Sequence, residues 1–282
     1  MIWKPNKANA ALCRTYGEAN PLTAPIARPA PPWLKDLAGA WIFYSILPAW
    51  PWPAPRFERI ARFAPWIGCL LGSLQAGLWM LLVQLGWLSV AVAPLVLAFG
   101  IWLSGGLHHD GLMDTADGLA AGRERRLVAM DDSRVGASGV LALAMVLLVE
   151  ASALIQLDAQ APLALMFAAV IGRGAPLWAM ARFGYLRSQD TGTAAFHRAH
   201  GRPLWDALPL LLILVFFVVF AGLKLVPLLM GCAVALVVPE LLGRRLGGHT
   251  GDSYGASLVL AEAFTLLMVA LVETAALAET AS

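Results

Sequence analysis

Three carboxylates in one short stretch are the residues whose types and spacing most clearly suggest chemistry. Asp110, Asp114 and Asp117 are four and three residues apart, so a helix would place them on one stripe. Like charges on one stripe repel each other unless a cation lies among them. Carboxylate oxygens are ligands that Mg²⁺ and Mn²⁺ prefer. The pattern therefore predicts a divalent metal site, of the kind that serves phosphate chemistry.

The composition says where this site must lie. The 282-residue chain is 59% hydrophobic and only 13% charged, whereas soluble domains contain about 25% charged residues. Residues 63–107, directly before the carboxylates, contain no Asp, Glu, Lys or Arg. The chain is therefore expected to be an all-α, polytopic integral membrane protein. Its net charge of +2 gives no sign of nucleic-acid binding, and its three cysteines have no metal-ligand spacing.

Seven apolar segments are long enough, or nearly so, to span a membrane as helices. They are residues 63–85, 87–107, 138–157, 161–181, 204–222, 225–242 and 256–277. An eighth segment, 37–50, is short and ends among prolines, which favours an interfacial or re-entrant position and leaves six to eight spans. Residues 1–33 are polar and Pro-rich, and we expect a flexible tail followed by one membrane catalytic domain over 34–282.

Basic residues indicate the orientation. Arginines gather in the loops before, between and after three helical hairpins, while the opposite short loops contain almost no charge. Because cytoplasmic loops carry the excess of Lys and Arg, the loops 105–136, 182–202 and 243–255 are expected on the cytoplasmic face. This places one active site, built from three loops, at a bacterial inner membrane.

Further polar residues could complete such a site. Asp132, Ser133 and Arg134 would form a phosphate clamp, with Asp132 also available to the metal. The loop before the last span contains Thr250, Gly251 and Asp252. Its backbone N–H groups could cradle an anion, with Asp252 as a metal ligand, or Asp252 or Ser253 could simply cap the helix that follows.

Two basic or titratable positions stand out for other reasons. His108 precedes the acidic stripe and could act as an acid or base near neutral pH. Arg173 lies within an apolar segment, where a charge is expensive and usually functional. Its partner could be Glu150, Glu240 or Glu262. The glycines flanking the stripe suggest close approach of a bulky ligand.

These motifs together resemble the cobalamin synthase family, the adenosylcobinamide-GDP ribazoletransferases of late vitamin B12 assembly. The resemblance covers about residues 37–272. It rests on Gly105-Gly106-Leu107-His108, Asp110-Gly111-Leu112, Asp114-Thr115-Ala116-Asp117-Gly118, Asp132-Ser133-Arg134-Val135-Gly136, Gly248, Thr250-Gly251-Asp252, Gly255-Ala256 and Glu262, with Arg173, Arg182, Tyr185 and Gly192 at positions where the family has similar residues. The chain departs from the family pattern at Ile46, Asp131 and Asp190.

The resemblance implies a Mg²⁺-dependent transferase. It would join α-ribazole, or its 5′-phosphate, to adenosylcobinamide-GDP, releasing GMP and giving adenosylcobalamin or its 5′-phosphate. Asp110, Asp114, Asp117, Asp132 and Asp252 would hold the metal. The phosphate oxygens would be bound by Ser133, Arg134, Arg173, Arg182, Thr250 and Gly251, and His108 or an unligated aspartate would take the proton. The implied partners are these small molecules and membrane lipid, and the oligomeric state is open.

Other classes share some of these features. Intramembrane prenyltransferases bind prenyl diphosphates with acidic helix ends, and CDP-alcohol phosphotransferases need a longer Asp/Gly/Arg pattern that is incomplete here. An ion transporter would fit Arg173, Glu150, Glu240 and Glu262, but transporter sites lie near the membrane midplane. The acidic residues of this chain instead cluster at one interface.

Overall fold

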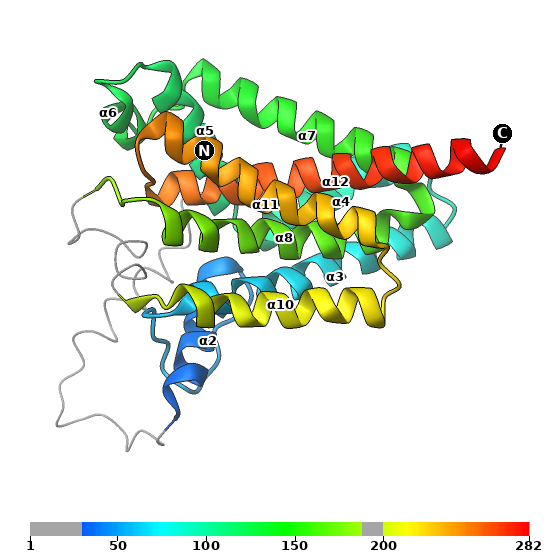
Figure 1. The fold of residues 1–282 in the computed structure, drawn as a ribbon, viewed down its shortest axis with the longest axis horizontal. Coiled ribbons are helices and arrows are strands. Elements are labelled where there is room, and N and C mark those ends of the chain that lie inside the picture. Colours follow the sequence, from blue (N-terminus) through cyan, green and yellow to red (C-terminus); the bar gives the residue numbers. More distant parts are fainter. Residues whose placement is uncertain (1–29, 188–199, 282) are drawn as a thin grey trace.

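The computed structural model describes residues 30–187 and 200–281, and within these residues the secondary structure is helical apart from one isolated bridge. Long helices run side by side and are joined at the two ends of a bundle (Figure 1). The helices are α2 (Pro32–Tyr44), η1 (Ile60–Phe63), α3 (Ala64–Gln84), α4 (Ser89–Leu103), α5 (Leu107–Ala120), α6 (Arg126–Asp131), α7 (Ala137–Leu157), η2 (Asp158–Gln160), α8 (Ala161–Arg182), α10 (Pro203–Val219), α11 (Leu225–Leu246) and α12 (Gly251–Ala281). The predicted all-α membrane fold is confirmed.

Four stretches are long and apolar enough to cross a membrane. They are Ile60–Gln84, Ala137–Arg182, Leu225–Leu246 and Gly251–Ala276, and the bent pair α4 and α5 would make a fifth. The second stretch contains both α7 and α8, which run in opposite directions along the bundle (Figure 1). The chain is thus an integral membrane protein, and the count of seven spans stays a prediction.

Helix α8 lies in the middle of the bundle and packs against α3, α12, α11 and α10. Glycines permit the closest of these contacts. A Cβ atom on Gly68 of α3 would lie 2.5 Å from the carbonyl oxygen of Ala169, and one on Gly72 would lie 2.7 Å from the Cα atom of Met166. Small residues that bring backbones together are the usual way in which membrane helices pack. Helix α8 therefore serves as the rigid centre around which the end loops are arranged.

The predicted span 87–107 ends earlier than expected, because the chain bends by 94° between α4 and α5. Gly105 and Gly106 form this bend, both with φ of +69°, a left-handed conformation that glycine adopts without steric cost. Helix α5 consequently lies across the end of the bundle, where it packs against α12, α7 and α6. The acidic stripe is therefore on a separate helix at the bundle end.

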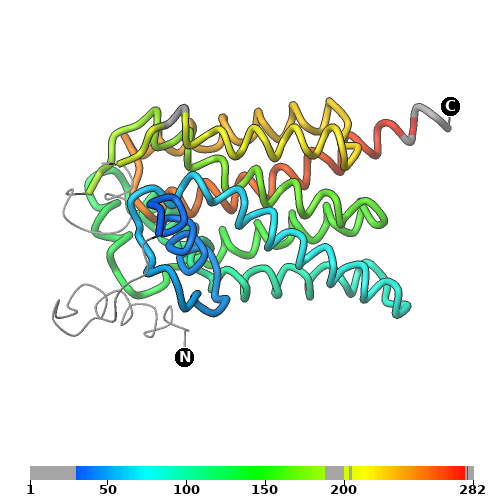
Figure 2. The backbone as a smooth tube through the Cα atoms, turned by 90° about the horizontal axis from the view of Figure 1, so that it is seen from below, coloured from blue at the N-terminus to red at the C-terminus, as the bar shows by residue number. Residues whose placement is uncertain are grey.

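The predicted interfacial segment 37–50 forms the short helix α2 and the turn that follows it. Helix α2 lies at the same end of the bundle as α5 and α6, as both views show (Figures 1 and 2). Ile46 follows it, and its N–H donates to the carbonyl of Leu103 at 2.9 Å. This backbone contact joins the turn after α2 to the end of α4, whatever the side chain at position 46.

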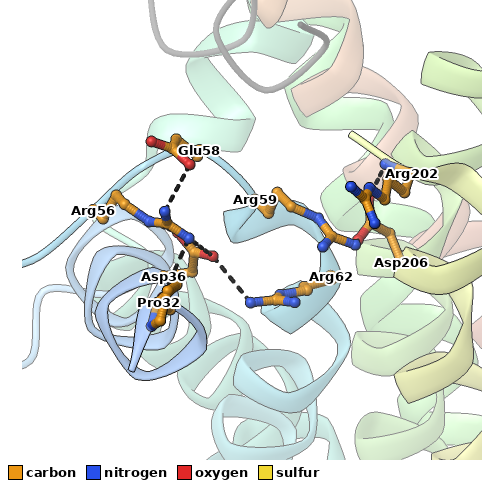
Figure 3. A network of polar contacts seen from close by, with 8 residues as sticks. All are labelled: Pro32, Asp36, Arg56, Glu58, Arg59, Arg62, Arg202 and Asp206. Carbon is orange, nitrogen blue, oxygen red and sulfur yellow. Dashed lines mark hydrogen bonds and ion pairs between the residues drawn. The ribbon is translucent and has the colours of Figure 1, made fainter. Parts of the chain in front are cut away.

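Ion pairs fix α2 to the bundle (Figure 3). The carboxylate of Asp36 is fully buried and accepts hydrogen bonds from Arg56, at 2.8 Å to each oxygen, and from Arg62 at 2.9 Å. Arg59 reaches Asp206 of α10 at 2.5 Å. These arginines were counted in the sequence only as an indication of orientation, but in the structure they join three segments at one end of the molecule.

Candidate functional site

Asp110 and Asp114 of α5 lie near Asp252, which belongs to the first turn of α12. Gly111 allows the two helices to meet there, because a Cβ atom on Gly111 would lie 2.7 Å from the carbonyl oxygen of Asp252. Two segments far apart in the sequence thus bring three carboxylates together. We call Asp110, Asp114 and Asp252 the acid cluster.

The charges in the acid cluster are not balanced. The pKa of Asp114 is raised to about 7, first by burial and then by the neighbouring charges of Asp110 and Asp252. Burial also raises the pKa of Asp110. Both shifts mean that the folded protein disfavours the charged carboxylates as they stand. A cation placed among them would relieve this cost.

Arg187 supplies part of that compensation. Its Nη2 lies 2.8 Å from Oδ2 of Asp252 and 2.9 Å from Oδ1 of Asp131. The segment 184–187 is held in place by His249, whose N–H donates to Gly184 and whose carbonyl accepts from Leu186, at 2.9 and 2.8 Å. Sequence reasoning missed Arg187 as a site residue. No local pattern links Arg187 to Asp252, because the backbone pairing between residues 184–186 and His249 spans more than sixty positions.

Asp117 points its carboxylate at a different target. One oxygen accepts from the N–H of Gly136 at 2.7 Å and the other from the N–H of Gly139 at 2.8 Å. These are donors at the N-terminus of α7, which a carboxylate stabilises by hydrogen bonding and by the helix dipole. Both oxygens of Asp117 therefore cap α7, and its metal role stays a prediction.

Two of the glycines around the stripe serve helix packing, and the expectation that these glycines make room for a ligand stays a prediction. Gly111 meets α12 as described, and a Cβ atom on Gly118 would lie 2.7 Å from Cγ of Met130 and 2.9 Å from the carbonyl of Arg126 in α6. Gly106 is the exception, since a Cβ atom there would meet nothing within 4 Å. Only the bend thus faces open space.

The predicted phosphate clamp lies on the surface. Arg134 has a side chain 87% exposed, and it forms a two-point ion pair with Asp132 at 2.6 and 3.0 Å, with Ser133 between them in the chain. The hydrogen bonds from Arg134 lower the pKa of Asp132 to about 2. The pair is accessible, so its guanidinium can exchange one anion for another.

Thr250 and Ser253 cap the start of α12, so the predicted capping role of Ser253 is found, but together with Thr250 and not Asp252. The N–H of Thr250 donates to Oγ of Ser253 at 2.8 Å, and the N–H of Ser253 donates to Oγ1 of Thr250 at 3.2 Å. Such reciprocal bonds satisfy donors at a helix start. Buried His249 supports the cap through a 2.9 Å contact to Ser253. Thr250 and Gly251 thus position Asp252, and contact of either with substrate stays a prediction.

A second polar group lies inside the bundle. Arg173 is buried and pairs with Glu262, which confirms one of its three suggested partners, and it also donates to the carbonyl of Ala169 at 3.1 Å. Glu150 and His108 line the same cavity, of about 40 Å³. We call Arg173, Glu262, Glu150 and His108 the buried network.

His108 faces away from the acidic stripe. It is buried, stacks on Tyr44 with ring centroids 5.7 Å apart, and lines the cavity beside Arg173. On a helix with 3.6 residues per turn, position 108 lies on nearly the opposite side of α5 from positions 110 and 114. The structure therefore does not bring His108 to the acid cluster.

Arg182 lies in a third place. Its side chain is half-exposed, 3.8 Å from Glu240, and its guanidinium stacks over Phe183 at 5.2 Å. Glu240 also pairs with Arg244 at 2.9 Å. Gly192 and Asp190 of the same loop lie outside the described residues. The structure thus groups Asp110, Asp114 and Asp252 with Arg187, but places Arg173, Arg182 and His108 elsewhere.

The acid cluster fits a divalent cation by the chemistry of its donors, which are carboxylate oxygens with a surplus of negative charge. In the described parts of the chain, however, no three His, Cys, Asp or Glu side chains are already gathered closely enough to hold an ion. Arg187 lies against one of the three carboxylates. Metal binding would therefore require the side chains of the cluster to converge.

Comparison with known proteins supplies the family. Residues 36–270 match the family described as cobalamin-5-phosphate synthase. An adenosylcobinamide-GDP ribazoletransferase of Prochlorococcus marinus (strain MIT 9303) is 60% identical over 262 residues, covering 87% of this chain and 99% of the relative. Proteins with the same name from Thermosynechococcus vestitus and Desulforamulus reducens are 41% and 39% identical, covering 83% and 81% of this chain and 95% and 93% of their own lengths.

No solved structure matches this chain. The family match nevertheless includes all three residues of the acid cluster, on α5 and at the start of α12. The similarity to the relatives extends over nearly their whole length. On this ground the chain belongs to the cobalamin-5-phosphate synthase family.

Proposed function

We propose that this protein transfers a cobinamide phosphate from adenosylcobinamide-GDP to α-ribazole or its 5′-phosphate, with release of GMP. A ribose hydroxyl oxygen forms a bond to the phosphorus next to the cobinamide, the diphosphate bond to GMP breaks, and the hydroxyl proton leaves. The products are adenosylcobalamin or its 5′-phosphate. The proposal rests above all on the 60% identity to a relative named for this reaction, along almost the full length of that relative.

Asp110, Asp114 and Asp252 are the residues that would hold Mg²⁺. The ion would neutralise the diphosphate oxygens and stabilise the departing GMP. The support for this assignment is the grouping of carboxylates in the acid cluster, where burial first and then the neighbouring charges of Asp110 and Asp252 raise the pKa of Asp114. Asp132 is also exposed at this end of the protein, but its carboxylate is paired with Arg134.

Two arginines are suited to bind the phosphates. Arg187 already bridges two carboxylates, and Arg134 is exposed, so each guanidinium could exchange a carboxylate for a phosphate oxygen. Ser133, next to Arg134, would add a hydroxyl donor. We assign Arg173 a positioning role instead, because its partner Glu262 holds it inside the bundle.

The proton of the attacking hydroxyl would pass to a carboxylate of the acidic stripe. His108 was the other candidate, but it lies on the far side of α5 and packs against Tyr44. Its side chain lines the cavity beside Arg173. An aspartate not engaged by the metal is therefore the better acceptor.

The protein is proposed to lie in a bacterial inner membrane with the acid cluster on the cytoplasmic side. The basic segments that contain Arg56, Arg134, Arg187 and Arg244 are at the same end of the bundle as α5 (Figure 1). An excess of arginine marks the cytoplasmic side. The substrates would thus reach the site from the cytoplasm, while lipid surrounds the long helices.

The reaction can be tested with purified protein in detergent or in liposomes. GMP release from adenosylcobinamide-GDP should require both a ribazole acceptor and Mg²⁺, stop when EDTA is added, and resume when Mg²⁺ is restored. Absence of GMP release from active-site-intact protein would disprove the proposal. Turnover of a CDP-alcohol or a prenyl diphosphate would favour those enzyme classes, and ion flux without GMP release would favour a transporter.

A further inference from the structure

A pocket of about 490 Å³ lies where the chain bends between α4 and α5. Its walls are mainly apolar: Ala98 and Trp102 come from α4, Gly106 from the bend, Met113 from α5 and Val135 from the loop before α7. Pockets of about 300–1,000 Å³ with apolar walls and a few polar groups are typical of small-molecule sites. The size and lining of this pocket therefore match a drug-sized ligand.

The shape of the pocket follows from the bend itself. The left-handed glycines turn α5 by 94° away from α4, and the pocket lies in the angle between the two helices. A side chain at Gly106 would find open space there. Trp102 keeps 60% of its surface exposed and Val135 keeps 43%. Because these two apolar side chains are already exposed at the pocket, they can contact a ligand without any rearrangement of the core.

One polar group at the pocket wall links it to the acid cluster. Asp110 lines the pocket and also belongs to the acid cluster, since it shares a stripe of α5 with Asp114. A ligand bound in the pocket would thus place its apolar part against Trp102 and Met113 and a polar edge beside Asp110. An aromatic base joined to a ribose has this division, with a flat apolar ring system at one end and hydroxyl groups at the other.

We propose that the pocket between α4 and α5 binds the aromatic base of the acceptor nucleoside and directs its ribose towards the acid cluster. This inference rests on the proposed function. A ribazole nucleoside is small enough to be taken up whole by a pocket of 490 Å³, whereas adenosylcobinamide-GDP is much larger than the pocket. Stacking of a base on an aromatic side chain such as Trp102 contributes about 1–3 kcal/mol.

Filling the pocket provides the decisive experiment. Ala98→Trp places a large side chain in the pocket, whereas Ala91→Trp places the same side chain two turns away on the exposed face of α4 and is the matched control. Ala98→Trp should raise KM for the ribazole acceptor at least 10-fold and leave KM for adenosylcobinamide-GDP within 2-fold of wild type. Ala91→Trp should change neither value.

A second variant and a binding measurement guard against misfolding. Trp102→Leu keeps an apolar wall but removes the aromatic surface, and it should raise the acceptor KM about 10-fold, as expected for the loss of one stacking contact. Equilibrium dialysis of radiolabelled α-ribazole should show the same order of affinities, independently of turnover. Both variants should melt within a few degrees of Ala91→Trp in detergent.

The outcomes separate this inference from the proposed function. If wild-type protein releases no GMP, the proposed function is wrong, and dialysis still reports whether the pocket takes the nucleoside. If wild-type protein is active but Ala98→Trp and Trp102→Leu leave the acceptor KM unchanged, the pocket is a lipid-facing surface and the inference is overturned. An equal rise in KM for both substrates would overturn it as well.

Discussion

The acid cluster and the buried network are both made of charged side chains, but they differ in how their charges are balanced. The acid cluster has three carboxylates and shares one arginine, Arg187, with Asp131. The buried network sets Arg173 against Glu262, inside the bundle and beside a cavity of only about 40 Å³. A cavity of that size holds about two to four water molecules, which leaves no room for a diphosphate.

This difference separates two uses of charge in a membrane protein. Charge left unbalanced at an accessible end is available to a ligand that brings the opposite charge. Charge paired within the bundle fixes the relation between helices, here α8 and α12, and its removal is expected to affect folding first. Sequence reasoning singles out both groups on similar grounds, because each consists of ionisable residues in or next to apolar segments. Four substitutions test the distinction.

The largest effect is expected from Asp114→Asn. Loss of one carboxylate from the acid cluster should lower kcat for GMP release by about 10³-fold, in the range for removal of one electrostatic contact to a reacting group. The melting temperature should not fall, because the raised pKa of Asp114 shows that its charge is disfavoured in the folded protein. The control is Glu124→Gln, which changes an exposed side chain at the same end of the bundle. Wild-type turnover in Asp114→Asn would show that the acid cluster does not take part in the reaction.

Arg173→Met should act on stability. It leaves the carboxylate of Glu262 without its partner inside the bundle, and breaking a buried pair in this way costs about 3–5 kcal/mol. Unfolding of the protein in detergent should show this loss, and the double variant Arg173→Met/Glu262→Gln should recover part of it. Lys224→Ala is the comparison for an exposed ion pair, because the side chain of Lys224, which pairs with Glu273, is 61% exposed. This substitution should cost less than about 1 kcal/mol of stability. If the Arg173→Met protein is as stable as wild type but inactive, the buried network takes part in the reaction and is not only structural.

Arg187→Ala should have a smaller effect on turnover than Asp114→Asn. Removing its guanidinium should lower kcat/KM by about 10²-fold, since a phosphate contact is lost while the carboxylates remain. Arg187→Lys should recover part of the activity, because the charge is kept but the planar fork is not. Arg123→Ala, an exposed arginine at the same end, serves as the comparison. Equal activity of the Ala and Lys variants would argue against a directional phosphate contact.

The smallest effect is expected from Asp117→Asn. If this carboxylate only caps α7, the substitution keeps one acceptor oxygen and should cost about 0.5–2 kcal/mol of stability, with kcat nearly unchanged after correction for folded protein. If Asp117 binds the metal as the sequence pattern predicts, kcat should instead fall as in Asp114→Asn. Paired measurements of melting and GMP release on both variants decide between the two roles.

Much of the fold could be predicted because it depends on long, local patterns. All seven apolar segments are helical within a few residues of their expected ends, and the loops 105–136 and 243–255 meet at one end of the bundle, together with residues 182–187. The bend at Gly105 and Gly106 was not predicted, because an apolar run continues through it to Leu107. The predicted tail lies outside the described residues except for residues 30–33.

The site was predicted less well, since spacing along a helix cannot say what faces each side. Asp117 fits the stripe by its spacing, yet it accepts a hydrogen bond from Gly136, nineteen positions later, at the start of α7. Arg187 meets Asp252 where segment 184–187 pairs with His249. His108 adjoins the stripe in sequence but lies on the opposite side of α5. Contacts of this kind depend on tertiary packing, which no local pattern specifies.

The crossing of α5 and α12 at Gly111 has a consequence for biosynthesis. Asp110 and Asp114 are made early, but Asp252 belongs to the final helix that the structure describes, so the set of carboxylates is complete only after α12 has inserted. A chain that ends before His249 would lack both the carboxylate of Asp252 and the residue that holds the segment of Arg187 in place. Partly made chains should therefore be inert, and they cannot consume an activated corrinoid before the protein is whole.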